Sequence, residues 1–154
     1  MQDKPLLISS LLEHAERFHP NVEIVTKTIE GPIHRCNWRE LGERSRRLAI
    51  ALQKRGVRKG SMVATVATNT YRHLELYFAV MGIGAVLHTI NPRLSPEHLE
   101  YVVNHAEDEI LFFDLPFAPL VASSALPGTD AVILTGLPDR SRPVVMSSAC
   151  SRCT

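Results

Sequence analysis

Apolar residues along this chain recur at helical spacing in some stretches and form short continuous or alternating runs in others. Helical spacing predicts helices over about residues 9–18, 37–55, 70–85, 95–106 and 117–124. The apolar runs predict strands over about residues 62–67, 86–90, 110–113 and 131–134. Strands that alternate with helices of this length form right-handed β-α-β crossovers, so we expect an α/β protein with a parallel sheet.

A hairpin is predicted ahead of the parallel part. Residues 22–29 are rich in β-branched side chains, residues 33–36 return, and Glu30-Gly31-Pro32 lies between the two runs. Glycine and proline in such a tripeptide favour a turn. The two runs are therefore expected to pair as antiparallel strands.

Capping side chains predict where three of the helices begin. Ser9 or Ser10 can cap the first helix. Asn37, with a glutamate three residues later, predicts a capping box. Ser95, which a proline follows, predicts a capped start with proline in the first turn.

For two of the helices the sequence also predicts which side chains share a face. The helix that begins near residue 70 is expected to carry one apolar stripe, formed by Leu74, Phe78, Met81 and Ala85. The helix over residues 37–55 has four arginines that we expect mostly on its solvated face: Arg39, Arg44, Arg46 and Arg47. The alternative for these arginines is an anion-binding patch.

Composition excludes several classes of function. A chain of 154 residues suits one domain, and its formal net charge of +1 favours neither nucleic acid nor an anionic membrane as a partner. No apolar run approaches the roughly 18 residues that span a bilayer, and the first residues lack a signal-peptide cleavage site. Three scattered cysteines make no disulfide framework, so we expect a cytoplasmic protein.

Most motifs that could carry chemistry have a simpler structural interpretation. Gly82-Ile83-Gly84 precedes a predicted strand, whereas a dinucleotide-binding loop follows one, so these glycines are expected to end a helix. Cys150 and Cys153 form a CxxC pair without the second pair of ligands that zinc requires. Cys36 is expected to be a small buried side chain. We therefore assign no metal site and no catalytic residue.

The best local candidates for a functional site are His88, Asn91 and Arg93. His88 lies inside an apolar strand, where a hydrogen-bonded structural role is favoured over a pocket role. Asn91 and Arg93 follow the carboxyl end of that strand, the edge where open α/β sheets bind ligands. Arg93 could pair with a carboxylate or phosphate, or it could tie the loop to Glu97 or to backbone carbonyls.

Several stretches of the chain resemble one family of enzymes. The stretches LLISSLLEHAERF, CNWREL and RSRRLAIALQKRGVRKGSMVA resemble the opening of acyl-CoA ligases, which are adenylate-forming enzymes. HTINPRL followed by NHAED is similar to medium-chain fatty acyl-CoA ligases and methylmercaptopropionate-CoA ligases. The resemblance covers roughly residues 6–135. It implies that residues 6–138 are a partial AMP-binding domain. Residues 139–154 have no hydrophobic periodicity and are expected to form an irregular or disordered tail.

The resemblance implies a two-step reaction for the family. A carboxylate attacks the α-phosphorus of Mg-ATP to give an acyl-adenylate, and coenzyme A then displaces AMP to give a thioester. The family's Ser/Thr/Gly-rich phosphate loop and its later magnesium, ribose and lysine motifs have no counterpart in this sequence. No cofactor-binding residue is therefore assigned.

Two expectations follow for the chain as it stands. The first is an inactive fragment of a ligase; a frameshift, an early stop or a partial gene model would each produce one. The alternative is a non-catalytic interaction module that associates with full-length ligase subunits.

Overall fold

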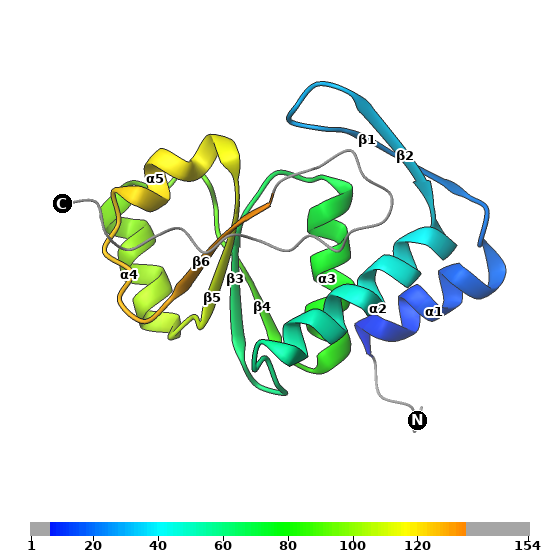
Figure 1. Ribbon diagram of the computed structural model, residues 1–154, viewed down its shortest axis with the longest axis horizontal. Helices are drawn as coiled ribbons and strands as arrows, with labels where there is room; N and C mark the ends of the chain where they lie inside the picture. The colour runs from blue at the N-terminus through cyan, green and yellow to red at the C-terminus, as the bar shows by residue number, and fades with distance from the viewer. Residues whose placement is uncertain (1–6, 135–154) are drawn as a thin grey trace, which may run out of the picture. The chain divides into compact units, whose positions relative to one another are not determined.

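The computed structural model (Figure 1) confirms the α/β class and the parallel sheet. It describes residues 7–134. In chain order the elements are α1 (Ile8–Phe18), β1 (Glu23–Lys27), β2 (Ile33–Asn37), α2 (Trp38–Lys54), β3 (Met62–Val66), α3 (Tyr71–Ile83), β4 (Val86–Thr89), α4 (Pro96–Ala106), β5 (Ile110–Asp114), a 3-10 turn (Leu115–Phe117), α5 (Ala118–Ala122) and β6 (Asp130–Leu134). The expected tail at 139–154 lies outside the described residues. None of the helices within 7–134 is both long enough and apolar enough to cross a membrane.

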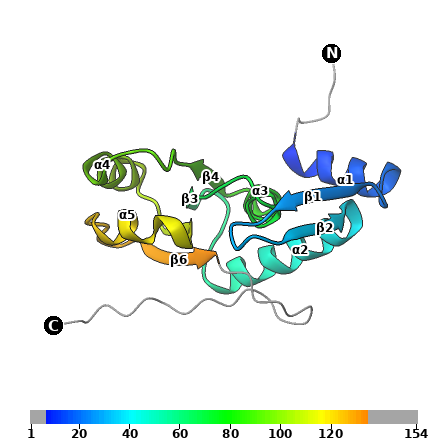
Figure 2. The same cartoon turned by 90° about the horizontal axis from the view of Figure 1, so that it is seen from above.

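These elements form two compact units, which we describe separately (Figure 2). Within the described residues, unit 1 comprises 7–58 and 69–84, so it holds α1, the β1–β2 hairpin, α2 and α3. Unit 2 comprises 59–68 and 85–134 and holds the parallel sheet with α4 and α5.

The hairpin of unit 1 is confirmed. β1 and β2 pair antiparallel, with Ile24 opposite Cys36 and Lys27 opposite Ile33. Cys36 then joins a buried cluster with Leu12 of α1, Leu41 of α2 and Tyr71 of α3. The alternation along β2 is what places Cys36 inside while its neighbours face outward.

The capping box at the start of α2 is confirmed. The Glu40 amide donates to Asn37 Oδ1 at 3.0 Å, and the Asn37 amide donates to Glu40 Oε2 at 3.3 Å. The helix ends with Gly56 in the left-handed region at φ 98°, as predicted.

Replacing the capping side chain should weaken unit 1. We expect Asn37→Ala to lower the free energy of unfolding by about 1 kcal/mol, because it removes a partner of an orphan helix amide. Urea-induced unfolding followed by circular dichroism measures the change. Asn21→Ala, at an exposed turn residue, is the control and should stay within about 0.5 kcal/mol of the parent. Equal losses from both changes would contradict a capping role.

The predicted cap of α1 is wrong. The helix begins one residue earlier than expected, with Leu7 at the cap position and no side-chain cap. Ser10 instead donates its hydroxyl back to the Leu7 carbonyl at 2.6 Å. Serine makes such local backbone bonds as readily as it caps, so composition alone does not distinguish the two.

The stripe predicted for α3 is only part of its packed surface. Leu74 and Phe78 pack, partly buried, against the cluster that holds Cys36, and Ala85 is buried just after the helix. The most buried residues of the helix lie on another side: Tyr71, Arg72, His73, Glu75, Leu76, Ala79 and Val80. They surround much of the helix and include Arg72, His73 and Glu75, so no single apolar stripe marks the inner face. The helix ends at Gly84, left-handed at φ 83°, which confirms the structural interpretation of the Gly-x-Gly.

Unit 2 is a four-stranded parallel sheet in the order β4-β3-β5-β6 (Figure 1). α4 and α5 pack on one face of it, where Leu99, Val103 and Val121 meet apolar residues of the strands. All five residues of β5 are buried, as expected for a central parallel strand. The capped start of α4 is confirmed, since the His98 amide donates to Ser95 Oγ.

Candidate functional site

The carboxyl edge of the unit 2 sheet is where a ligand site is expected. Open parallel sheets bind ligands in the crevice beyond the carboxyl ends of their strands. Three segments meet this edge: Thr68 follows β3, Asn91–Arg93 follow β4, and Asp114 is the last residue of β5. The register places the ends of β3 and β5 side by side, with Val66 paired with Phe113.

The Asn91–Arg93 loop leaves β4 through a tight turn. Ile90 is buried and its amide donates to the Thr65 carbonyl at 2.8 Å, which anchors the loop to β3. Asn91 Oδ1 then accepts the Arg93 amide at 3.0 Å. This side-chain turn holds the loop in one conformation, and the Asn91 and Arg93 side chains are exposed beyond it.

Of the alternatives for Arg93, a tie from its guanidinium to Glu97 or to a backbone carbonyl is not seen among the described residues. Within residues 7–134 the Arg93 guanidinium has neither an ion pair with Glu97 nor a bond to a backbone carbonyl. Glu97 lies on the first turn of α4, where hydrogen bonds from its own amide and from Ser95 lower the pKa of its carboxyl. Arg93 therefore presents an exposed cation near the carboxyl edge, the arrangement that favours binding an anionic group.

Asp114 is a buried carboxylate at the same edge, and sequence reasoning missed it. Its residue has no exposed surface, and Oδ2 accepts both the amide and the hydroxyl of Thr68, at 2.7 and 2.8 Å. These bonds fix the turn that leaves β3. The only sequence signal was an aspartate directly after the apolar run ILFF.

His88 has a structural partner. Its Nδ1 lies 2.7 Å from Asp108 Oδ2, and Asp108 is buried in the connection between α4 and β5. Burial raises the pKa of the Asp108 carboxyl, and the hydrogen bond from His88 opposes that rise. The hydrogen-bonded role favoured from the sequence matches this geometry.

The structure does not bring the three sequence candidates together. Asn91 and Arg93 share a loop beyond the carboxyl end of β4. His88 is bonded to a residue that precedes the amino end of β5. The carboxyl-edge site is therefore Asn91, Arg93, Thr68 and Asp114, without His88.

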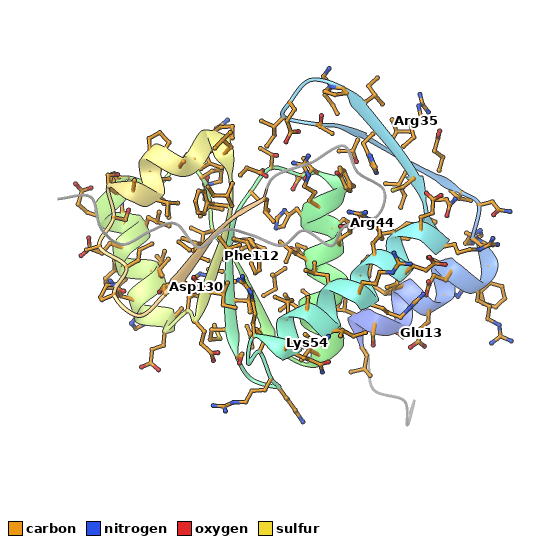
Figure 3. The ribbon with its side chains drawn as sticks, viewed as in Figure 1. Glu13, Arg35, Arg44, Lys54, Phe112 and Asp130 are labelled. Atoms are coloured by element: carbon orange, nitrogen blue, oxygen red, sulfur yellow. The ribbon has the colours of Figure 1, made fainter. Side chains whose placement is uncertain are left out.

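One ion pair with a buried carboxylate in unit 1 corrects the interpretation of a single arginine of the arginine-rich face, Arg44. Arg44 (labelled in Figure 3) donates through Nε to Glu75 at 2.5 Å and through Nη2 at 3.3 Å, and the Glu75 side chain is only 6% exposed. Burial raises the pKa of Glu75, and the bonds from Arg44 oppose it. Arg44 is thus a structural cation. Arg47 fits the solvated face, since its pair with Glu43 is long and exposed.

Cys36 is an unreactive thiol in this setting. The residue is 7% exposed, and burial together with nearby Glu75 raises the pKa of its thiol to about 11. Reaction with a disulfide reagent needs the thiolate, which at pH 8 is on the order of one thiol in a thousand at this pKa.

We expect Cys36 to react slowly in the folded chain. In a Cys150→Ser/Cys153→Ser variant, the rate with a colorimetric disulfide reagent at pH 8 should be at least about 100-fold below the rate in concentrated urea. The folded rate should rise as the pH approaches 10. Equal rates with and without urea would contradict the burial of Cys36.

The described residues offer little else that could hold a cofactor. No group of three or more His, Cys, Asp or Glu side chains within 7–134 could hold a metal ion. A cavity of about 240 Å³ lies in unit 2 between the end of α4 and the turn before β6, lined partly by Asn104, Glu107 and Gly128. It lies by the residues that precede the amino ends of β5 and β6, away from the carboxyl-edge site. The CxxC pair lies outside the described residues.

Comparison with known proteins now gives the family. The fold is that of the N-terminal domains of adenylate-forming acyl-CoA ligases. The family model "AMP-binding enzyme" matches residues 11–148, and the chain belongs to this family. The proposed domain boundary at 138 stays a prediction.

Curated relatives agree with the family. The chain is 50% identical over 123 residues to a 3-methylmercaptopropionyl-CoA ligase of Ruegeria lacuscaerulensis, covering 80% of this chain and 23% of that ligase. It is 45% identical over 136 residues to a medium-chain-fatty-acid–CoA ligase of Ectopseudomonas oleovorans, covering 87% of this chain and 25% of that ligase. The sequence resemblance is confirmed, and the chain spans about a quarter of the length of these relatives.

Solved structures show the same fold. A Mycobacterium tuberculosis fatty acyl CoA synthetase matches with a TM-score of 0.73 at 18% identity, over 81% of this chain and 26% of that one. The N-terminal domain of FACL13 from the same organism matches with a TM-score of 0.74 at 19% identity. The match covers 83% of this chain and 33% of that one.

Proposed function

We propose that this chain supplies the first part of an ATP-dependent carboxylic acid–CoA ligase, and that the 154 residues alone catalyse neither half-reaction. The family match carries the first half of the proposal, together with the two curated ligases. Their names point to a medium-chain fatty acid or 3-methylmercaptopropionate as the acid. The full reaction would use ATP, Mg²⁺ and coenzyme A.

The second half of the proposal rests on the charges that the reaction must neutralise. Adenylate formation concentrates negative charge on the phosphates, and enzymes stabilise it with amides, cations or metal ions placed in advance. The sequence has no Ser/Thr/Gly-rich phosphate loop. The carboxyl-edge site offers one exposed cation, Arg93, and the buried carboxyl group of Asp114. One guanidinium at a sheet edge can bind an anion but cannot complete such a site.

Acid-dependent exchange of pyrophosphate into ATP tests the proposal. We expect no exchange above background from the purified chain with octanoate, hexanoate or 3-methylmercaptopropionate. A full-length ligase purified in parallel is the positive control. Exchange that co-purifies with the chain and requires the acid would refute the proposal that the chain is inactive.

A second proposal is a non-catalytic module that associates with full-length ligase subunits. The observation that favours it is the edge of the unit 2 sheet, where β6 is the last strand in the order β4-β3-β5-β6 within the described residues and could pair with a strand of another chain. Co-purification of the tagged chain with a full-length ligase would support this role, and the absence of any complex would contradict it. For either role we propose a cytoplasmic location, to which the buried free thiol of Cys36 is suited.

A further inference from the structure

One face of α1 carries apolar side chains that the described residues leave uncovered. We call Leu7, Leu11, His14 and Phe18 the α1 seam. Leu7, Leu11 and Phe18 are 56%, 60% and 58% exposed, and His14 is exposed beside them. The opposite face of α1 buries Leu12 against the core of unit 1.

The spacing of the α1 seam indicates what kind of surface it fits. Its members are separated by four, three and four residues. This is the spacing of the contact positions in paired helices, where each side chain inserts between side chains of the facing helix. The His14 and Phe18 rings contact each other along the seam, with centroids 4.7 Å apart. The surface therefore fits another helix.

The order of the spacings along the seam is the same from either end of the helix. Four-three-four spacing lets an identical helix pack antiparallel, with Leu7 facing Phe18 of the other copy and Leu11 facing its His14. A two-fold interface requires this kind of self-complementarity. We propose that the α1 seam is a self-association surface, on which α1 of a second copy of this chain packs antiparallel.

The flanks of the seam suit this arrangement. Ile8, 42% exposed, and the partly exposed Ala15 lie along one side and would extend the apolar contact. On the other side Ser10 would meet Arg17 of the second copy, a polar contact without repulsion. The Arg17 guanidinium already lies over the Phe18 ring, 5.4 Å from its centroid.

Charge does not oppose self-association. The chain has a formal net charge of +1, so two copies repel each other little. The Glu16 carboxylate of α1 is already paired with Arg46 of the same chain at 2.7 Å, so its charge is offset within each copy. A parallel arrangement would align the two helix dipoles, so the antiparallel one is favoured.

The size of the seam predicts a weak dimer. An 11-residue helix is about 16 Å long at 1.5 Å per residue. Two such helices bury less than the roughly 1,200–2,000 Å² of stable interfaces. Association should therefore depend on concentration.

Sedimentation equilibrium of the full chain tests the proposal. The weight-average mass should rise from 17.2 kDa toward twice that value as the concentration increases from about 10 to about 300 µM. Leu11→Lys should raise the dissociation constant at least about tenfold, because it places a charge in the contact. Its fold should persist, since Leu11 is mostly exposed, and circular dichroism checks this. Phe18→Ser is a second seam variant with the same expectation.

Ile50→Lys is the matched control. Ile50 is 53% exposed on α2, outside the α1 seam, so this variant should associate like the parent. A parent chain that stays monomeric at about 300 µM would overturn the proposal and leave the seam to a different partner. Equal association by the parent and both lysine variants would also overturn it, since the contact would lie on another surface.

A charge pair tests the antiparallel register. Leu11→Lys and His14→Glu should each be monomeric alone. An equimolar mixture should form a heterodimer, because the introduced lysine of one chain faces the introduced glutamate of the other. A mixture that sediments as the two separate monomers would overturn the antiparallel arrangement.

Discussion

Replacing Arg44 by methionine is expected to lower the free energy of unfolding by about 3 kcal/mol. The change leaves the Glu75 carboxylate, 6% exposed, without its two hydrogen bonds. A buried charge that loses its partner retains the full cost of leaving water. Since Arg44 itself is 37% exposed, the loss should fall at the lower end of the range for such pairs.

A double-mutant cycle separates the ion pair from general damage to α2. Arg44→Met/Glu75→Met removes both charges and should recover most of the lost stability, because apolar residues of similar volume often replace a buried pair without loss. Arg47→Met is the matched control on the same helix. Its pair with Glu43 is 3.8 Å long and exposed, so it should cost less than about 0.5 kcal/mol. A double variant no more stable than Arg44→Met alone would show that the charge pair is not the cause.

Local signals made the boundaries of several elements predictable. The capping box at Asn37 and the Ser95 cap depend on side chains within three residues of each other, so the sequence contains all that is needed. The central strands β3 and β5 were equally clear, because strands covered on both faces appear as continuous apolar runs. Ser10 failed as a cap because its hydroxyl had an alternative local acceptor.

Contacts between distant residues could not be predicted in the same way. Arg44 and Glu75 are 31 positions apart, and Thr68 and Asp114 are 46 apart. From the sequence alone, each of these polar residues would be expected on the surface, because its partner comes close only in the folded chain. The buried face of α3 was predicted only in part for the same reason: Glu75 is buried on it with a partner that the helix pattern does not contain.

Only part of the carboxyl-edge site was predictable from the sequence. Asn91 and Arg93 were found because proline breaks the chain just after an apolar strand, which marks a loop at a ligand-binding edge. Asp114 and Thr68 were missed because their bond joins two strand ends. His88 was singled out because it lies inside an apolar strand, and its ring nitrogen pairs with Asp108 instead of joining the carboxyl-edge site.

Replacing His88 by leucine is expected to destabilise unit 2 by about 2–3 kcal/mol at pH 7.5. The reason is that Asp108, whose side chain is fully buried, loses the hydrogen bond that offsets its burial. His88→Asn retains a donor near the position of Nδ1 and should lose less than half as much. His105→Leu, at an exposed position of α4, is the control and should stay within about 0.5 kcal/mol of the parent.

The loss should depend on pH in a direction set by Asp108. Burial raises its pKa above the unfolded value, and removing His88 takes away the interaction that lowers it. A carboxyl with a raised folded pKa binds its proton more tightly in the folded state, so stability falls as the pH rises from the unfolded pKa through the folded one. The deficit of His88→Leu relative to the parent should therefore be largest at pH 7.5 and shrink toward pH 4.5. A deficit independent of pH would assign the loss to packing around His88, whereas one that grew on acidification would mean that His88 binds Asp108 mainly as a cation.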